Sequence, residues 1–132
     1  MRENAVTFNL ATLFMYKKQF DKVIETLQFV DYEDFTYNLN SKVMLMSAYY
    51  ETDEIEPLYS LMDSFRTYLN RHKDLATFKR KPYLNFITYT KRLSKLLSSD
   101  RKGLDKIKSD IEAEKGNVSS LSWLKEKIAE LE

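Results

Sequence analysis

Two stretches of the sequence decide the fold: residues 9–30 read NLATLFMYKKQFDKVIETLQFV, and residues 44–65 read MLMSAYYETDEIEPLYSLMDSF. Apolar residues recur within each stretch at the spacings of three and four that are typical of helices. A shift of 35 residues aligns seven apolar pairs: Leu10 with Leu45, Leu13 with Ala48, Phe14 with Tyr49, Phe20 with Ile55, Val23 with Leu58, Leu27 with Met62, and Val30 with Phe65. Pairs of helices repeated at a period in the thirties indicate a helical-repeat protein, in which each hairpin buries its apolar face against its neighbour.

The composition favours an all-α fold for the whole chain. Of its 132 residues 43% are hydrophobic and 14% aromatic, which is enough apolar material for a buried core. Two Gly and two Pro leave few residues for the tight turns of β-hairpins. We therefore expect a single helical-repeat domain over residues 1–132. Its expected parts are a first hairpin at 4–31, a second hairpin at 34–70, a basic connector at 71–81 and C-terminal helices at 82–132.

Local signals predict several helix starts. Asp34 is the expected N-cap of the second hairpin, and Asp53 with Glu56 forms a capping-box-like pair at the start of the next helix. Pro82 should start or kink a helix at the end of the basic connector. The last helix should begin at Ser119 or Ser120.

The first hairpin resembles the tetratricopeptide family. The residues that carry the resemblance are Asn9-Leu10-Ala11, Phe14, Phe20, Val23 and Leu27, which stand where that family places its Leu-small pair, its first-helix aromatic and the main residues of its second helix. The second hairpin is looser, because Met46 and Leu58 replace small residues at the helix crossing. The resemblance covers residues 4–66 and implies antiparallel hairpins stacked as a short α-solenoid, with the C-terminal helices as a cap. Four short phrases also look like the C-terminal region of repeat proteins of Bacteroidetes-type bacteria: Asn9-Leu10-Ala11, Tyr37-Asn38-Leu39, Tyr83-Leu84-Asn85-Phe86 and Trp123-Leu124.

The resemblance also implies a binding groove. In tetratricopeptide domains the first helix of each hairpin lines a concave groove, which here would be formed by Phe8, Thr12, Met15 and Tyr16 of the first hairpin and by Val43, Ser47, Tyr50 and Glu51 of the second. Some relatives grip a terminal carboxylate there with Lys and Asn. This chain has Phe8 and Thr12 at those places, so we do not expect that clamp. An apolar groove suits an amphipathic helix, from a partner or from this chain's own tail.

Charge is distributed unevenly, although the net charge is only +1. Residues 1–65 hold 5 Lys+Arg against 11 Asp+Glu, residues 66–106 hold 12 against 3, and residues 107–132 hold 4 against 6. The cations concentrate in a basic belt formed by Arg66, Arg71, Lys73, Lys79, Arg80, Lys81, Lys91, Arg92 and Lys95. Three interpretations stay open: plain solvated charge, a docking surface for an acidic protein or for the acidic half of a second copy, and a nucleic-acid or polyanion site in which aromatic rings stack on bases.

No pattern of residues indicates an enzyme, a cofactor or a metal site. His72 is the only histidine and lies in a basic run without an acid to orient it, so we expect an ordinary surface residue. The acidic cluster Glu51, Asp53, Glu54 and Glu56 lacks the glycine turn of a calcium loop and fits carboxylates at a helix start. The chain has no Cys and no phosphate-binding glycine loop. We therefore expect a non-catalytic protein without a cofactor.

The sequence predicts an interaction scaffold or part of a larger repeat protein. Besides the groove, the candidate partner-binding residues are Arg71, Lys73, Lys79, Arg80 and Lys81. The expected partner is another protein, the rest of the same chain, or a second copy in a homodimer. If the chain is a fragment that has lost earlier repeats, the uncovered first hairpin would expose apolar residues around Val6, Phe8, Leu13 and Phe20. Polyanion or nucleic-acid binding at residues 66–95 is the alternative. No apolar run reaches the roughly 18 to 20 residues of a membrane helix, and the cytoplasm is the default location unless a fragment has lost its targeting signal.

Overall fold

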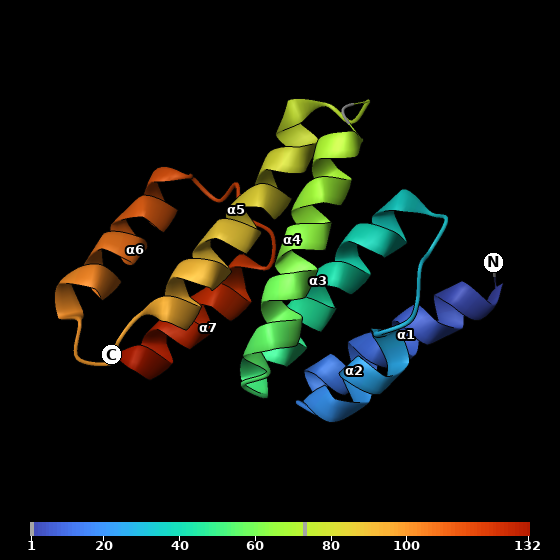
Figure 1. Ribbon diagram of the computed structural model, residues 1–132, viewed down its shortest axis with the longest axis horizontal. Coiled ribbons are helices and arrows are strands. Elements are labelled where there is room, and N and C mark those ends of the chain that lie inside the picture. Colours follow the sequence, from blue (N-terminus) through green and yellow to red (C-terminus); the bar gives the residue numbers. More distant parts are fainter. Residues whose placement is uncertain (1, 73) are drawn as a thin grey trace. The chain divides into compact units, whose positions relative to one another are not determined.

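The computed structural model describes residues 2–72 and 74–132, apart from the side chains of Arg2, Glu3 and Phe78. Seven helices run through these residues and account for 76% of the chain (Figure 1). The predicted all-α fold is therefore confirmed. The chain divides into two compact units, residues 1–65 and 66–132, and each unit is described by itself. The expectation of a single domain stays a prediction.

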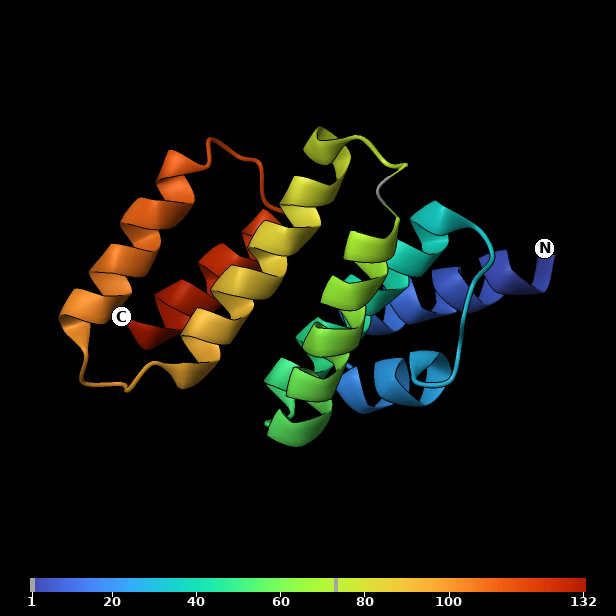
Figure 2. The same ribbon diagram turned by 45° about the horizontal axis from the view of Figure 1, so that its top comes forward.

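The first unit contains α1 (Arg2–Tyr16), α2 (Phe20–Leu27), α3 (Phe35–Glu51) and the first part of α4 (Ile55–Arg71). Both α1 and α2 pack on α3 (Figure 2). The ring of Phe8 contacts that of Tyr37, and one turn later in α1 the hydroxyl of Thr12 contacts Met44. Because the contacts advance along both helices in the same order, α1 and α3 run parallel. The hairpin partner α2 then runs antiparallel to α3.

The 35-residue repeat extends to the backbone of the two turns. The N–H groups of Lys18 and Gln19 donate to the carbonyls of Met15 and Phe14, and those of Asp53 and Glu54 donate to the carbonyls of Tyr50 and Tyr49. Lys18 and Asp53 both adopt left-handed backbone angles, with φ of 59° and 56°. This bond pattern is the Schellman motif that ends many helices. The next helices begin at Phe20 and Ile55, again 35 residues apart, so both hairpins share one local geometry.

The predicted start signals of the first unit have two different outcomes. The carboxylate of Asp34 accepts the Tyr37 N–H at 3.0 Å, which confirms the predicted N-cap of α3. The predicted capping box of Asp53 and Glu56 was wrong, because Asp53 takes the left-handed position that ends α3 and α4 begins at Ile55.

The second unit contains the end of α4, then α5 (Thr77–Lys95), α6 (Arg101–Ala113) and α7 (Leu121–Leu131). Helices α5, α6 and α7 pack on one another. Phe86, Ile87 and Leu124 are fully buried in this unit, and the ring of Trp123 lies 5.9 Å from that of Phe86. Ser120 directly precedes α7, so the predicted start of the last helix is confirmed.

The basic connector predicted at 71–81 is shorter in the structure, because α4 reaches Arg71 and α5 begins at Thr77. The cations of residues 79–81 therefore lie in the first turns of α5, and Pro82 lies inside the helix instead of at its start. A proline lacks an N–H, so α5 loses one backbone hydrogen bond near its beginning. The carbonyl of Pro82 accepts the Ser119 N–H at 3.0 Å, which ties the segment before α7 to this part of α5.

Candidate protein-binding surfaces

The structure brings Phe8 and Thr12 together with two residues of α3. The ring centroid of Phe8 lies 4.9 Å from that of Tyr37 and 6.4 Å from that of Tyr32. The hydroxyl of Thr12 donates to the Phe8 carbonyl at 2.9 Å and lies 3.8 Å from the Met44 sulfur. Thr12 is exposed, whereas Phe8, Tyr37 and Met44 are half-buried. We call this set, Phe8, Thr12, Tyr37 and Met44, the α1–α3 face.

Of the remaining residues predicted for the groove, Val43 and Ser47 are only 7% and 1% exposed in α3 and so do not line an open groove, whereas the others lie near the ends of the same two helices. Met15 and Tyr50 are 35 residues apart, are both half-buried, and occupy equivalent positions in α1 and α3. Tyr16 is the last residue of α1 and is 87% exposed. The two parallel helices thus present aromatic, thioether and hydroxyl groups side by side.

The basic belt is divided between exposed and internally paired cations. Arg71 is exposed at the end of α4, Lys79 and Lys81 are exposed in α5, and Arg80 is half-buried. The prediction for Lys73 lies outside the described residues. The first turn of α5 carries no acidic residue, and its N-cap Ala76 offers no side-chain hydrogen bond. Cations near the positive end of a helix are electrostatically unfavourable, so this cluster does not stabilise α5.

Arg92 belongs to the belt in sequence but binds an acid in the structure. Its guanidinium donates to the carboxylate of Asp110 at 2.8 Å, and Lys106 lies 3.0 Å from the same carboxylate. Hydrogen bonds from Lys106 and Arg92 hold the pKa of Asp110 below its usual value. Arg92 therefore joins α5 to α6, and the belt has fewer cations for a partner than its sequence indicates.

His72 does have an acid near it, contrary to the prediction. Its Nδ1 lies 3.9 Å from a carboxylate oxygen of Asp74, and its ring centroid lies 4.4 Å from that of Tyr68. Asp74 follows His72 by only two residues in the sequence. The His72 side chain is 40% exposed and that of Asp74 is 83% exposed, so the pair is a surface contact.

A polar cluster joins α5 to the end of α6. The amide of Asn85 donates to the carboxylate of Glu114 and, at 2.9 Å, to the Asn117 carbonyl. The hydroxyl of Tyr89 donates to the other carboxylate oxygen of Glu114 at 3.4 Å. Burial, followed by the negative charge of Glu114, raises the pKa of the Tyr89 phenol. These contacts link helices within one unit, and we assign them a structural role.

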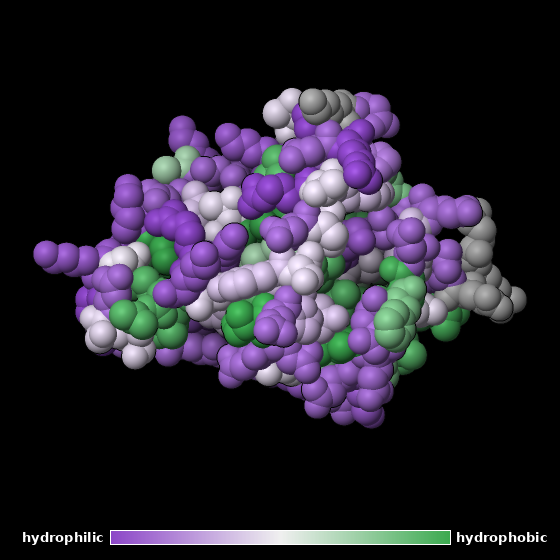
Figure 3. Space-filling view, viewed as in Figure 1, coloured by the Kyte–Doolittle hydropathy of each residue, from purple (hydrophilic) through white to green (hydrophobic). Residues whose placement is uncertain are grey.

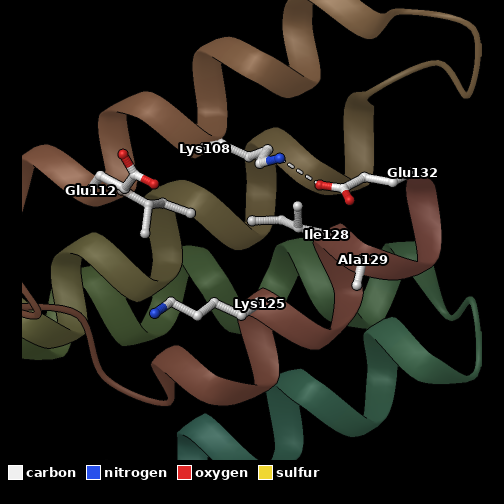
Figure 4. A pocket seen from close by; sticks show the side chains of 7 residues that line it. Lys108, Glu112, Lys125, Ile128, Ala129 and Glu132 are labelled. Atoms are coloured by element: carbon white, nitrogen blue, oxygen red, sulfur yellow. Dashed lines mark hydrogen bonds and ion pairs between the residues drawn. The ribbon is translucent and has the colours of Figure 1, made fainter.

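A cavity of about 240 Å³ lies between α6 and α7 (Figure 4). Its apolar wall includes Ile111, Ile128 and Ala129. Lys108 and Glu132 form an ion pair of 2.6 Å across its rim, and the hydrogen bond to Glu132 raises the pKa of Lys108. Each residue that lines this cavity fits an ordinary amphipathic helix, so no sequence pattern indicates the cavity.

The surface shown in Figure 3 is mostly hydrophilic, with separate hydrophobic patches between the charged residues. Within the described residues, no three His, Asp or Glu side chains gather as ligands for a metal ion. None of the described helices is both long and apolar enough to cross a lipid bilayer.

No family model, curated protein or solved structure matches this chain.

Proposed function

We propose that this chain is a protein-interaction module of the helical-repeat type, similar in plan to tetratricopeptide domains. The α1–α3 face would bind a helix or an extended peptide of another protein. The observation that carries the proposal is the parallel arrangement of α1 and α3, which come from hairpins of the same 35-residue repeat. The two helices meet at Phe8 with Tyr37 and at Thr12 with Met44, and a repeat protein forms a continuous binding surface where helices of successive hairpins lie side by side in this way.

The chemistry of the α1–α3 face suits a peptide. Half-buried aromatic rings provide rigid apolar contact area, and Met44 adapts its shape to different side chains. The exposed Thr12 provides a hydroxyl beside them. From Asn4 to Tyr16 the chain has no charged residue, so a partner would bury this part of the surface without removing charges from water.

Polyanion binding is the second candidate function. It is supported by the charge of residues 66–132, where the balance of Lys and Arg over Asp and Glu is +7, and by the exposed Arg71, Lys79 and Lys81. A bound phosphate group would offset the unfavourable placement of cations at the start of α5.

A capture experiment with three forms of the full chain separates the two functions. The baits are the wild type, the face variant Thr12→Lys with Met44→Lys, and the belt variant with Lys79, Arg80 and Lys81 changed to Ser. Proteins captured from the source organism are identified by mass spectrometry, purified and titrated by calorimetry. We expect the face variant to weaken binding at least about tenfold, because it puts charges against apolar groups of the partner, and the belt variant to bind normally. A titrated partner that binds the face variant as tightly as the wild type would refute the proposal.

The polyanion function is tested with a fluorescent single-stranded oligonucleotide. If the chain binds polyanions, its affinity for the oligonucleotide should fall steeply between about 50 and 200 mM salt, since each phosphate contact releases counterions. The belt variant should lose this binding. If the wild type and the belt variant bind the oligonucleotide equally weakly, polyanion binding by the belt is excluded.

A further inference from the structure

Three apolar residues on one face of α1 are open to solvent. Val6, Leu10 and Leu13 follow one another at helical spacing and are 60%, 43% and 45% exposed. We call them the α1 stripe. Each has a counterpart 35 positions later in α3: Ser41, Leu45 and Ala48, which are 5%, 7% and 0% exposed. The same face is thus buried in one hairpin and open in the other.

The contacts of α3 show what covers this face there. Tyr37 and Met44 touch Phe8 and Thr12 of α1, and α2 also packs on α3. Ser41 lies one helical turn from both Tyr37 and Met44, so it shares their side of the helix. The buried face of α3 therefore points towards the preceding hairpin, whose α2 runs antiparallel to it. The α1 stripe is built to receive an apolar helix in the same way.

The composition of α1 supports this reading. A helix that borders solvent usually carries charged residues on its outer face. The 13 residues from Asn4 to Tyr16 include no charged side chain, and the corresponding part of α3, from Leu39 to Glu51, includes only Lys42 and, at its end, Glu51. Helix α1 thus has the composition of the interior helix α3, although one of its faces is exposed.

We propose that a second copy of this chain covers the α1 stripe, through a twofold contact in which the two α1 helices pack antiparallel. The inference deepens the proposed function, since it names one partner of the module. A twofold axis near Leu10 places Leu10 against Leu10 of the second copy, and Val6 against Leu13 of the second copy. The antiparallel direction repeats that of α2 on α3.

The choice of a second copy follows from symmetry and charge. A twofold contact sets each residue at the axis against its own copy, so a charge near the axis faces a like charge. The α1 stripe avoids this repulsion because residues 4–16 are uncharged. One such contact also covers both exposed stripes at once and leaves no open end for further growth. A contact of one helix per copy is small for a stable interface, so we expect a dissociation constant on the order of 10 µM.

Sedimentation velocity of the full chain tests the dimer from about 1 to 200 µM, a range that brackets this affinity. The wild type should shift from the 15.7 kDa monomer to twice that mass. The variant Leu10→Lys with Leu13→Lys should weaken dimerisation at least about tenfold, because the charge at position 10 would face its own copy and the charge at position 13 would be buried against Val6 of the second copy. The matched control is Leu97→Lys, which changes a 73% exposed leucine outside the first unit and should leave the dimer intact. Circular dichroism checks that all forms keep their helix content.

Cysteine cross-linking tests the direction of the helices, since the chain has no cysteine of its own. In the proposed dimer Leu10→Cys forms a disulfide with itself on oxidation, whereas Val6→Cys alone forms little and pairs instead with Leu13→Cys in a mixture. Self-linking of Val6→Cys equal to that of Leu10→Cys would indicate parallel helices and overturn the proposal.

A wild type that stays monomeric over the whole range, or a dimer that survives the double lysine variant, overturns the proposal as well. Neither result affects capture through Thr12 and Met44, which tests the proposed function separately. A dimer that depends on the α1 stripe likewise stands even if no other protein is captured.

Discussion

The two units of this chain are both helical, but they are held together differently. In residues 1–65 one hairpin geometry occurs twice, and α1, α2 and α3 meet through apolar and aromatic side chains. In residues 66–132 the helices are also joined by polar contacts between distant residues, such as Arg92 with Asp110 and Asn85 with Asn117. The same helix packing can therefore occur twice where the contacts are apolar and periodic. Each polar contact, in contrast, depends on two specific residues.

The largest change in unfolding free energy is expected at Leu45, and it can be compared with the change at Leu10, its equivalent in the first hairpin. Leu45→Ala should cost about 2 to 4 kcal/mol of unfolding free energy, because its side chain is buried, while Leu10→Ala should cost less than about 1 kcal/mol in the monomer. Leu45 is 7% exposed and Leu10 is 43% exposed. Urea denaturation at low protein concentration measures both values. Equal losses would contradict the different environments of the two stripes.

The second unit is best tested at Gly103 in α6. Replacing a helical glycine by alanine usually stabilises by about 1 kcal/mol, but here a Cβ would collide with the carboxylate of Asp100 and lie 2.7 Å from a Leu96 methyl group. That carboxylate caps α6 by accepting the Gly103 N–H at 2.8 Å.

We therefore expect Gly103→Ala to destabilise by about 1 to 2 kcal/mol, since the cap would be displaced. Thermal unfolding measures the change, and the exposed Ser109→Ala in the same helix is the control, with a gain of at most about 0.5 kcal/mol. A stabilised Gly103→Ala would mean that Asp100 and Leu96 move aside without cost.

A smaller effect, in this case a stabilisation, is expected when α5 receives an N-cap like that of α3. Ala76→Asp places an acceptor at the uncapped start of α5, where the nearby cations also favour a negative charge. The expected stabilisation is about 1 kcal/mol. The reverse change, Asp34→Ala in the first unit, should lose a similar amount. Chemical denaturation of both variants checks whether the two starts respond with opposite sign.

The smallest effect concerns the two left-handed turns of the repeat. Lys18→Gly should stabilise by about 0.5 to 1 kcal/mol, because glycine adopts a positive φ without strain. Asp53→Gly should gain less, since Asp tolerates this conformation better than Lys. The control Lys18→Ala keeps a Cβ and should bring no gain. Thermal melts resolve these differences, and a gain for Lys18→Ala equal to that for Lys18→Gly would show that the backbone angle is not the cause.

The repeat made the first unit predictable, because aligning the sequence with itself located both hairpins. The N-cap Asp34 followed from its residue type just before an apolar run. It did not reveal that Leu10 and Leu45 differ in burial, since residue type and register are identical and only the neighbouring helix differs. In the second unit the start of α5 was misjudged, because a basic run followed by Pro82 looked like a connector. The pairing of Arg92 with Asp110 spans 18 residues along the chain and leaves no local pattern. Among the candidate sites, the repeat did not predict that Phe8 and Thr12 contact Tyr37 and Met44, because these pairs are not 35 residues apart, and the cavity between α6 and α7 had no signal in the sequence.

The packing of Trp123 against Phe86 provides an optical label for one unit. Trp123 is the only tryptophan in the chain and belongs to residues 66–132, so its fluorescence reports the unfolding of that unit, whereas far-ultraviolet circular dichroism reports all the helices. If both signals change at the same denaturant concentration, the two units unfold as one cooperative structure. If the indole signal changes separately, the acidic and basic halves are independent folding units, and each can be produced and studied as a protein of its own.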